Sequence, residues 1–240
     1  MHYINMNLLR AQPYKFIFLF SVIFNTAAAQ TIEHNGWLFW SHQQKLNEKW
    51  QFSSDIQIRS ADQLNYLNTL LIRPGIGYNI NDNQTVTVGY TYFGTWEKEN
   101  DAFIYENENR IFEQFQIESK LHKIELSNRI RYEQRFIREQ DDRFFAQRIR
   151  YNIQAVFPLI ANSEFTRGMY TSVQNELFLN VQGKSKLNNT VFDQNRSYVG
   201  LGYRFNKKLD IEADYMFRYI VEEDVNGRNN VLQIAIKSSF

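Results

Sequence analysis

Arginine recurs at every second position in several segments of this sequence, and its guanidinium group is the side chain here best suited to binding anions. Arg129, Arg131 and Glu133 form one such series, and Arg148 and Arg150 form another. Residues two apart in a β-strand point to the same face. The planar guanidinium fork binds carboxylates through two parallel hydrogen bonds. The candidate lumen-lining residues are Arg59, Arg73, Arg129, Arg131, Glu133, Arg148, Arg150, Glu176, Arg196, Arg204, Glu212, Asp214 and Arg218.

Two roles are open for this charged face. Opposite charges that meet across a small barrel form a salt-bridge network that plugs the lumen, and the same face can instead line a polar pore or an anion-binding pocket. The sequence does not distinguish the salt-bridge network from the pore or pocket.

Histidine and serine could support ester hydrolysis. Downstream of residue 29 the histidines are His34, His42 and His122. Ser41 precedes His42, but neighbours in a strand point to opposite faces, so they cannot act together as nucleophile and base. His42 could still meet a serine of another strand. A lipid-modifying enzyme of phospholipase or lipid A deacylase type is therefore the alternative to a non-enzymatic barrel, and no residue is assigned as catalytic.

Other chemistry has little support. The sequence has no metal-ligand spacing, glycine-rich phosphate loop or nucleophile elbow, so no metal or other cofactor is expected. Acidic residues gather at 97–108 and 222–224. These stretches could bind divalent or lipopolysaccharide-bridging cations, but no spacing matches a calcium loop and solvated loop charge is the favoured interpretation.

The elements that must position the charged face are long alternating strands. From Gly36 onward, segments of roughly 10–13 residues alternate apolar and polar side chains, which is typical of a membrane β-barrel. The final segment places Leu232, Ile234, Ile236 and Phe240 on one face. A terminal strand of this kind that ends on Phe resembles the last strand of bacterial outer-membrane proteins. The resemblance implies that the barrel-assembly machinery recognises it, with Ile234, Ile236 and Phe240 as the assembly signal.

Three places interrupt the alternation. Pro74 removes a ladder donor within a strand. Segment 109–119 alternates poorly, which a β-bulge would explain. Pro158 is expected to end the strand at 144–157, which leaves an unusually long link to Gly168.

The N-terminus predicts export. Arg10 and Lys15 precede an apolar run at 16–24, and small residues at 26–29 precede Gln30, in the order of a secretory signal. The run is only about nine residues, against roughly 20 for a spanning helix. We expect residues 1–29 to be removed and 30–240 to form the barrel. The chain has no Cys, which excludes disulfides and thiolate chemistry.

Charge and strand length narrow the class further. The chain has 27 Lys and Arg against 26 Asp and Glu; residues 1–29 hold two of the bases and no acid, which leaves −1 for the rest. The rest of the chain therefore has no excess of basic residues that would support nucleic-acid binding.

Strand length argues against a soluble β-sandwich, because sandwich strands average about five or six residues, half of the length here. A lipocalin-like barrel would bury the apolar face, but the signal sequence, the tyrosines near strand ends and Phe240 favour the outer membrane.

We predict an all-β, antiparallel transmembrane β-barrel of about 10–12 strands in the outer membrane of a Gram-negative cell. About eleven candidate strands are visible, yet bacterial single-chain barrels have an even number. The segment at Trp37 is therefore expected not to be a full wall strand, which gives ten, or one strand has been overlooked, which gives twelve. The final strand closes against the segment of either Trp37 or Trp50.

The chain resembles the Bacteroidetes-type outer-membrane proteins grouped as domain of unknown function 2490. The resemblance rests on WLFW at 37–40, KLNEKW at 45–50, NELF at 175–178, QNR at 194–196 and GLGYRF at 200–205. It covers nearly the whole mature chain and implies a porin-like barrel without an assigned task. The expected partners are outer-membrane lipid, lipopolysaccharide and the assembly machinery.

Overall fold

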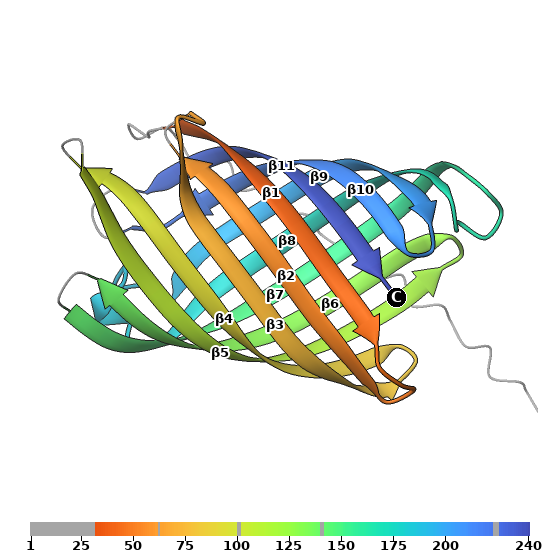
Figure 1. Ribbon diagram of the computed structural model, residues 1–240, viewed down its shortest axis with the longest axis horizontal. Helices are drawn as coiled ribbons and strands as arrows, with labels where there is room; N and C mark the ends of the chain where they lie inside the picture. Colours follow the sequence, from red (N-terminus) through yellow and green to blue (C-terminus); the bar gives the residue numbers. More distant parts are fainter. Residues whose placement is uncertain (1–31, 62, 100–101, 140–141, 223–225) are drawn as a thin grey trace, which may run out of the picture.

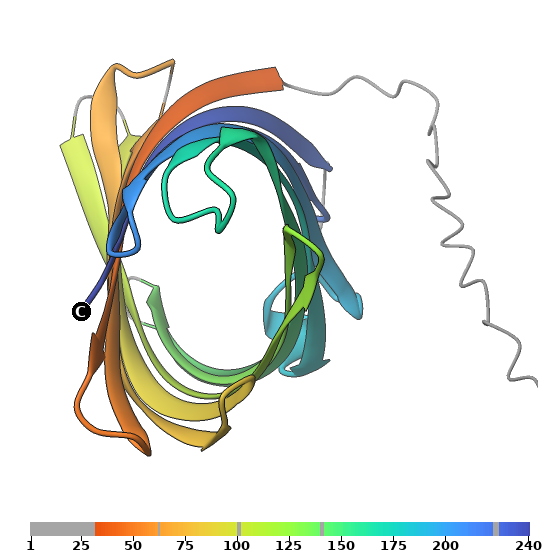
Figure 2. The ribbon, with the colours of Figure 1, turned by 90° about the vertical axis from the view of Figure 1, so that its right-hand side faces the viewer.

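The protein is a single closed β-barrel of eleven strands in the part of the chain that the structure describes (Figures 1 and 2). The computed structural model describes residues 32–61, 63–99, 102–139, 142–222 and 226–240. The strands are β1 (Ile32–Lys45), β2 (Trp50–Ala61), β3 (Tyr66–Asn81), β4 (Gln84–Glu99), β5 (Ala102–Leu121), β6 (Ile124–Glu139), β7 (Asp142–Ala161), β8 (Gly168–Gln182), β9 (Phe192–Asn206), β10 (Leu209–Ile220) and β11 (Gly227–Ser239). The all-β barrel prediction of about 10–12 strands is thereby confirmed.

Helix is almost absent from the described residues. One 3₁₀ turn, η1 (Lys184–Lys186), lies between β8 and β9. No helix within the described residues is long and apolar enough to cross a membrane. The predicted signal sequence at 1–29 lies outside the described residues.

Alternation along each strand separates an apolar outer face from a polar interior. In β11, Leu232 is 59% exposed, whereas Val231 and Ala235 are fully buried inside. Outward polar side chains bond to one another, as Asn175 does to Asn195 and Ser197 at 3.0 and 2.9 Å. The interior therefore receives nearly all of the charge.

The barrel closes through a parallel pair, which corrects the expectation of an even strand number. Every neighbouring pair is antiparallel except β1 and β11, which run side by side from Ile32↔Arg228 to Gln43↔Ser239 (Figure 1). The segment at Trp37 is a full wall strand, so both ten and twelve were wrong. Parallel strands also satisfy their backbone groups by ladder bonds, so an odd number leaves no open edge.

The seam between β1 and β11 has additional bonds near its end. The backbone N–H of Lys45 donates to the Phe240 carbonyl at 2.7 Å, and that of Phe240 donates to the Gln43 carbonyl at 2.9 Å. The Trp40 indole N–H donates to Ser238 Oγ at 3.1 Å. The terminal residue is thus part of the closure itself.

Two sequence-based expectations about strand irregularities were wrong. The ladders on both sides of β5 run without a register shift through 109–119, so no bulge is present there. The alternation looks disturbed because Phe112 points inward, where it is 2% exposed. Pro158 does not end β7, which continues to Ala161 after a register shift between Pro158 and Ile160.

The two ends of the barrel differ. The end at which β11 stops, here called the C-terminal end, has two-residue connections at 82–83, 122–123 and 207–208. The β7–β8 connection at 162–167 is longer and folds over this opening (Figure 2). Phe165 in this connection is 4% exposed, with its ring 5.9 Å from that of Tyr170.

Candidate functional site: an arginine-lined lumen

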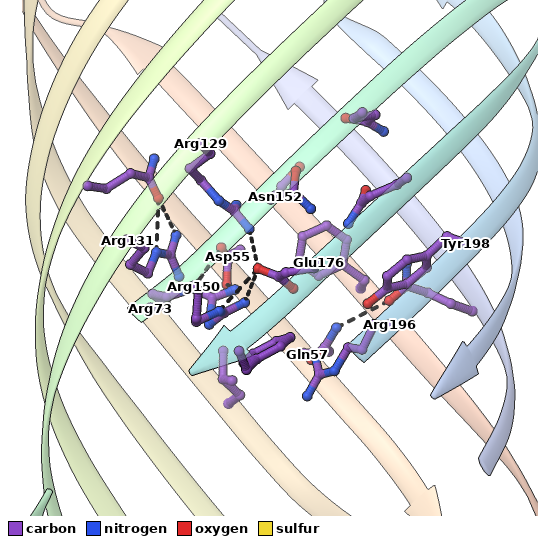
Figure 3. A pocket seen from close by; sticks show the side chains of 18 of the residues that line it. Asp55, Gln57, Arg73, Arg129, Arg131, Arg150, Asn152, Glu176, Arg196 and Tyr198 are labelled. Atoms are coloured by element: carbon purple, nitrogen blue, oxygen red, sulfur yellow. Dashed lines mark hydrogen bonds and ion pairs between the residues drawn. The ribbon is translucent and has the colours of Figure 1, made fainter. Parts of the chain in front are cut away.

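A central cavity of about 470 Å³ lies inside the barrel and is lined mainly by charged and amide side chains (Figure 3). Eleven of the thirteen predicted lumen residues line it. Of the other two, Glu133 is fully buried against Arg148 and Arg150, and Arg204 lines a second cavity. All thirteen predicted side chains therefore lie on the interior face.

Two glutamates organise the ion pairs of this interior. Glu133 accepts from Arg148 Nη2 and from Arg150 Nη1, each at 2.7 Å. Glu176 accepts from Arg150 and Arg129, again at 2.7 Å (Figure 3). Because these five residues come from β6, β7 and β8, the network links three adjacent strands. Charge-assisted bonds of this length are among the stronger ones in proteins.

Positive charge exceeds negative charge in the lumen. Ten arginines and Lys237 line the central cavity against six carboxylates, and the buried Glu133 is a seventh. Four of the arginines donate to amide oxygens and have no carboxylate within ion-pair distance among the described residues. These are Arg59, Arg131, Arg196 and Arg218.

Aromatic rings support several of these guanidinium groups. The guanidinium carbon of Arg59 lies 4.0 Å from the ring centroid of Trp37, and that of Arg131 lies 4.4 Å from that of Phe112. Phe178 lies 4.6 Å from Arg196. A desolvated cation–π contact is worth about 2 kcal/mol, so the rings partly replace missing counter-ions.

A second cavity of about 640 Å³ opens toward the C-terminal end. Arg204 lies beside it, bonds to Glu125 at 3.0 Å and Asp210 at 3.1 Å, and donates to the Phe165 carbonyl at 2.9 Å. Arg204 therefore anchors the β7–β8 connection to the barrel wall. The two cavities share six lining residues: Ser41, Gln43, Gln116, Ser127, Gln154 and Lys237.

Sequence reasoning missed part of the lumen. Arg135 continues the alternation of Arg129, Arg131 and Glu133, and extending that strand by two residues would have found it. Glu108 was interpreted as solvated loop charge, but it lies in β5, is 5% exposed and bonds to Arg110 and Arg135 at 2.6 Å. The acidic stretch at 97–108 is mostly strand, since β4 reaches Glu99 and β5 begins at Ala102.

His42 borders the central cavity, but no ion pair or hydrogen bond of the described residues joins it to the lumenal arginines and carboxylates. It belongs to the outward-facing series of β1 with Leu38 and Trp40, and its Nδ1 is 2.9 Å from Ser238 Oγ across the seam. No group of three or more His, Asp or Glu side chains in the described ranges could hold a metal ion.

Comparison with known proteins assigns the chain to a family. The profile of a family described as protein of unknown function (DUF2490) matches residues 34–229. The chain belongs to this family. An uncharacterized protein of Methylorubrum extorquens is 24% identical over 166 residues, which are 69% of this chain and 69% of that protein. No solved structure matches the chain. Membership in the DUF2490 family, expected from the sequence, is thus shown, and the family's description carries no activity.

Proposed function

We propose that this protein is an exported outer-membrane β-barrel that forms a narrow, anion-favouring pore and is not an enzyme. The observation that carries the proposal is the arginine excess along the central cavity, which shares lining residues with the second cavity toward the C-terminal end. A cavity lined by one sign of charge and walled by protein concentrates ions of the opposite sign.

The outer face supports a position in a lipid bilayer. Aliphatic side chains such as Val199 and Leu201 are more than half exposed between aromatic residues at the two ends. Membrane barrels carry such aromatic girdles at both interfaces. The ring pairs are Trp50–Tyr78 and Tyr203–Phe205 near the C-terminal end, and Tyr66–Phe103, Trp96–Tyr105 and Phe136–Phe145 near the opposite end.

The expected partners follow from this placement. The outward apolar band would contact lipid, and the end opposite the C-terminal end would face lipopolysaccharide. Ile234, Ile236 and Phe240 are exposed on the outer side of the closing strand, where the assembly machinery could bind them before closure. The signal sequence at 1–29 would deliver the chain to the periplasm.

Planar-bilayer recording of the purified full chain tests the pore. In a KCl gradient we expect small conductance steps and a reversal potential that favours chloride. Arg131→Gln removes a buried lumenal charge and should reduce this preference, whereas Arg138→Gln, exposed near the end of the same strand, should not. Absence of conductance from folded protein, or preference for potassium, would overturn the proposal.

A lipid-modifying enzyme is the second candidate, because His42 and Ser238 are hydrogen-bonded at 2.9 Å on the outer face. Serine hydrolases also need a group that orients the histidine, and Ser238 Oγ already accepts the Trp40 indole N–H. Incubation of the purified protein with phospholipid or lipid A vesicles decides between the two functions. Hydrolysis that disappears in both His42→Ala and Ser238→Ala would favour the enzyme, and hydrolysis that survives either change would exclude this pair.

A further inference from the structure

Three arginines without carboxylate partners gather in one half of the lumen, and we infer that they form a binding site for phosphate-type oxyanions. This three-arginine site consists of Arg59 of β2, Arg196 of β9 and Arg218 of β10. The inference rests on the proposed pore and deepens it by naming a class of solute.

Shared contacts bring the three side chains together. The Trp37 ring centroid lies 4.0 Å from the guanidinium carbon of Arg59 and 5.3 Å from that of Arg196. Gln194 Oε1 accepts from Arg196 Nε at 3.0 Å and from Arg218 Nε at 2.9 Å. Arg196 and Arg218 are also direct partners in the β9–β10 ladder.

Amide groups orient the guanidinium groups without neutralising them. Gln57 Oε1 accepts from Arg59 Nε at 2.8 Å, and Gln57 itself donates to Gln233 at 3.2 Å. Gln194 holds the other two arginines through their Nε atoms. Tyr198 lies beside Arg196 in the cavity (Figure 3), and Gln194 also lines this cavity. In Arg196 and Arg218, the bonds to Gln194 use Nε and leave the terminal Nη pairs for another acceptor.

Burial makes this arrangement costly unless an anion is present. Arg59 is 8% and Arg196 is 7% exposed, and no carboxylate of the described residues lies within ion-pair distance of the three arginines. A buried charge without a counter-ion is strongly unfavourable, and three like charges that share contacts add mutual repulsion. A ligand with two or more negative charges would offset both costs.

The donors fit oxyanions better than halide. Planar guanidinium forks bind phosphate and carboxylate oxygens through paired hydrogen bonds, whereas a single chloride cannot use the fork geometry. The cavity of about 470 Å³ lies within the usual range for small-molecule sites. Inorganic phosphate and the phosphate group of a small solute share the chemistry that this site would recognise.

Calorimetry of the purified full chain in detergent tests the site with inorganic phosphate, glycerol 3-phosphate, succinate and chloride at equal ionic strength. We expect saturable binding of phosphate at a stoichiometry of one, with Arg196→Gln and Arg218→Gln each weakening it by about 10-fold or more. Arg73→Gln is the matched control, since it removes an interior charge that is paired with Asp55 at 2.8 Å outside the three-arginine site. It should change the phosphate affinity less than threefold.

Several outcomes would overturn the site. These are no phosphate binding beyond that of chloride, tighter binding of succinate than of phosphate, or equal losses in Arg73→Gln and Arg196→Gln. Each variant is first checked for a folded barrel by its heat-dependent shift in gel mobility. If a variant does not fold, Arg196→Lys replaces it, because lysine keeps the charge but loses the fork and should still weaken binding.

Bilayer recordings separate this inference from the pore on which it rests. Block of chloride current by phosphate, relieved in Arg218→Gln, supports both. Phosphate binding in calorimetry without any conductance would refute the proposed pore and support the three-arginine site. Anion-selective conductance without phosphate binding, and without block of the chloride current by phosphate, would support the pore and refute the three-arginine site.

Discussion

Removal of the Glu133 charge should destabilise the barrel more than the loss of any exposed carboxylate. Glu133 is 0% exposed and receives three charge-assisted bonds, from Arg148 Nε at 3.0 Å and Nη2 at 2.7 Å and from Arg150 Nη1 at 2.7 Å. Glu133→Gln keeps the side-chain size and one acceptor oxygen but leaves two buried guanidinium groups short of a counter-charge.

The size of the effect follows from the remaining partners. Breaking a buried ion pair by removing one member costs about 3–5 kcal/mol. Arg148 keeps Asp193 at 2.8 Å and Arg150 keeps Glu176 at 2.7 Å. We therefore expect the free energy of unfolding of Glu133→Gln to fall by about 3 kcal/mol, at the lower end of that range.

Equilibrium urea unfolding of the full chain in lipid vesicles, followed by tryptophan fluorescence, measures this change. The control is Glu118→Gln, an exposed carboxylate in the neighbouring strand that accepts only from Gln116 at 2.8 Å. Its unfolding free energy should stay within about 0.5 kcal/mol of the parent. A loss of less than about 1 kcal/mol in Glu133→Gln would mean that the lumenal ion pairs contribute no more to the stability of the barrel than exposed ion pairs do.

Three further outcomes are expected. Gly89→Ala should lower the unfolding free energy by about 1–3 kcal/mol in the same urea experiment, because its Cβ would clash with the Phe112 ring and lie 2.5 Å from the Pro74 carbonyl oxygen. Gly227→Ala, whose Cβ would meet no atom of the described residues closer than 3.5 Å, should be nearly neutral. In bilayers, Phe165→Ala should raise the single-channel conductance by freeing the connection over the C-terminal opening, and a conductance no higher than that of Ser163→Ala would contradict this. Since the chain has no Cys, an impermeant maleimide should label Ser185→Cys on intact cells and Ser163→Cys only after permeabilisation; the reverse pattern would invert the orientation.

The two faces of the barrel could be predicted from the sequence because a strand repeats every two residues. The alternation of Arg129, Arg131 and Glu133 placed all three on the interior face before any pairing was known. The face of Phe112 was predicted wrongly. Apolar side chains were assigned to the lipid-facing side, but the Phe112 ring points inward and packs against the guanidinium group of Arg131. An interior arginine can stabilise an inward aromatic ring, so the type of residue alone does not give its face.

Pairing was harder to foresee because it depends on register and closure. Arg204 bonds to Glu125, which is 79 residues earlier in the chain. Nothing local to either residue indicates that they meet across the opening. The strand number was mispredicted for a similar reason. Eleven segments were recognised in the sequence, but the expectation of an even number changed this to ten or twelve. A parallel β1–β11 pair satisfies the backbone groups of both strands and so allows eleven.

The parallel seam has a practical consequence for experiments on this protein. In a barrel built only of hairpins, tags fused to the two ends of the chain emerge on the same side. Here β1 and β11 run in the same direction, so Ile32 and Phe240 lie at opposite ends of the barrel. A reporter placed ahead of Ile32 would be displayed on one side of the membrane, while a reporter after Phe240 would report on the other.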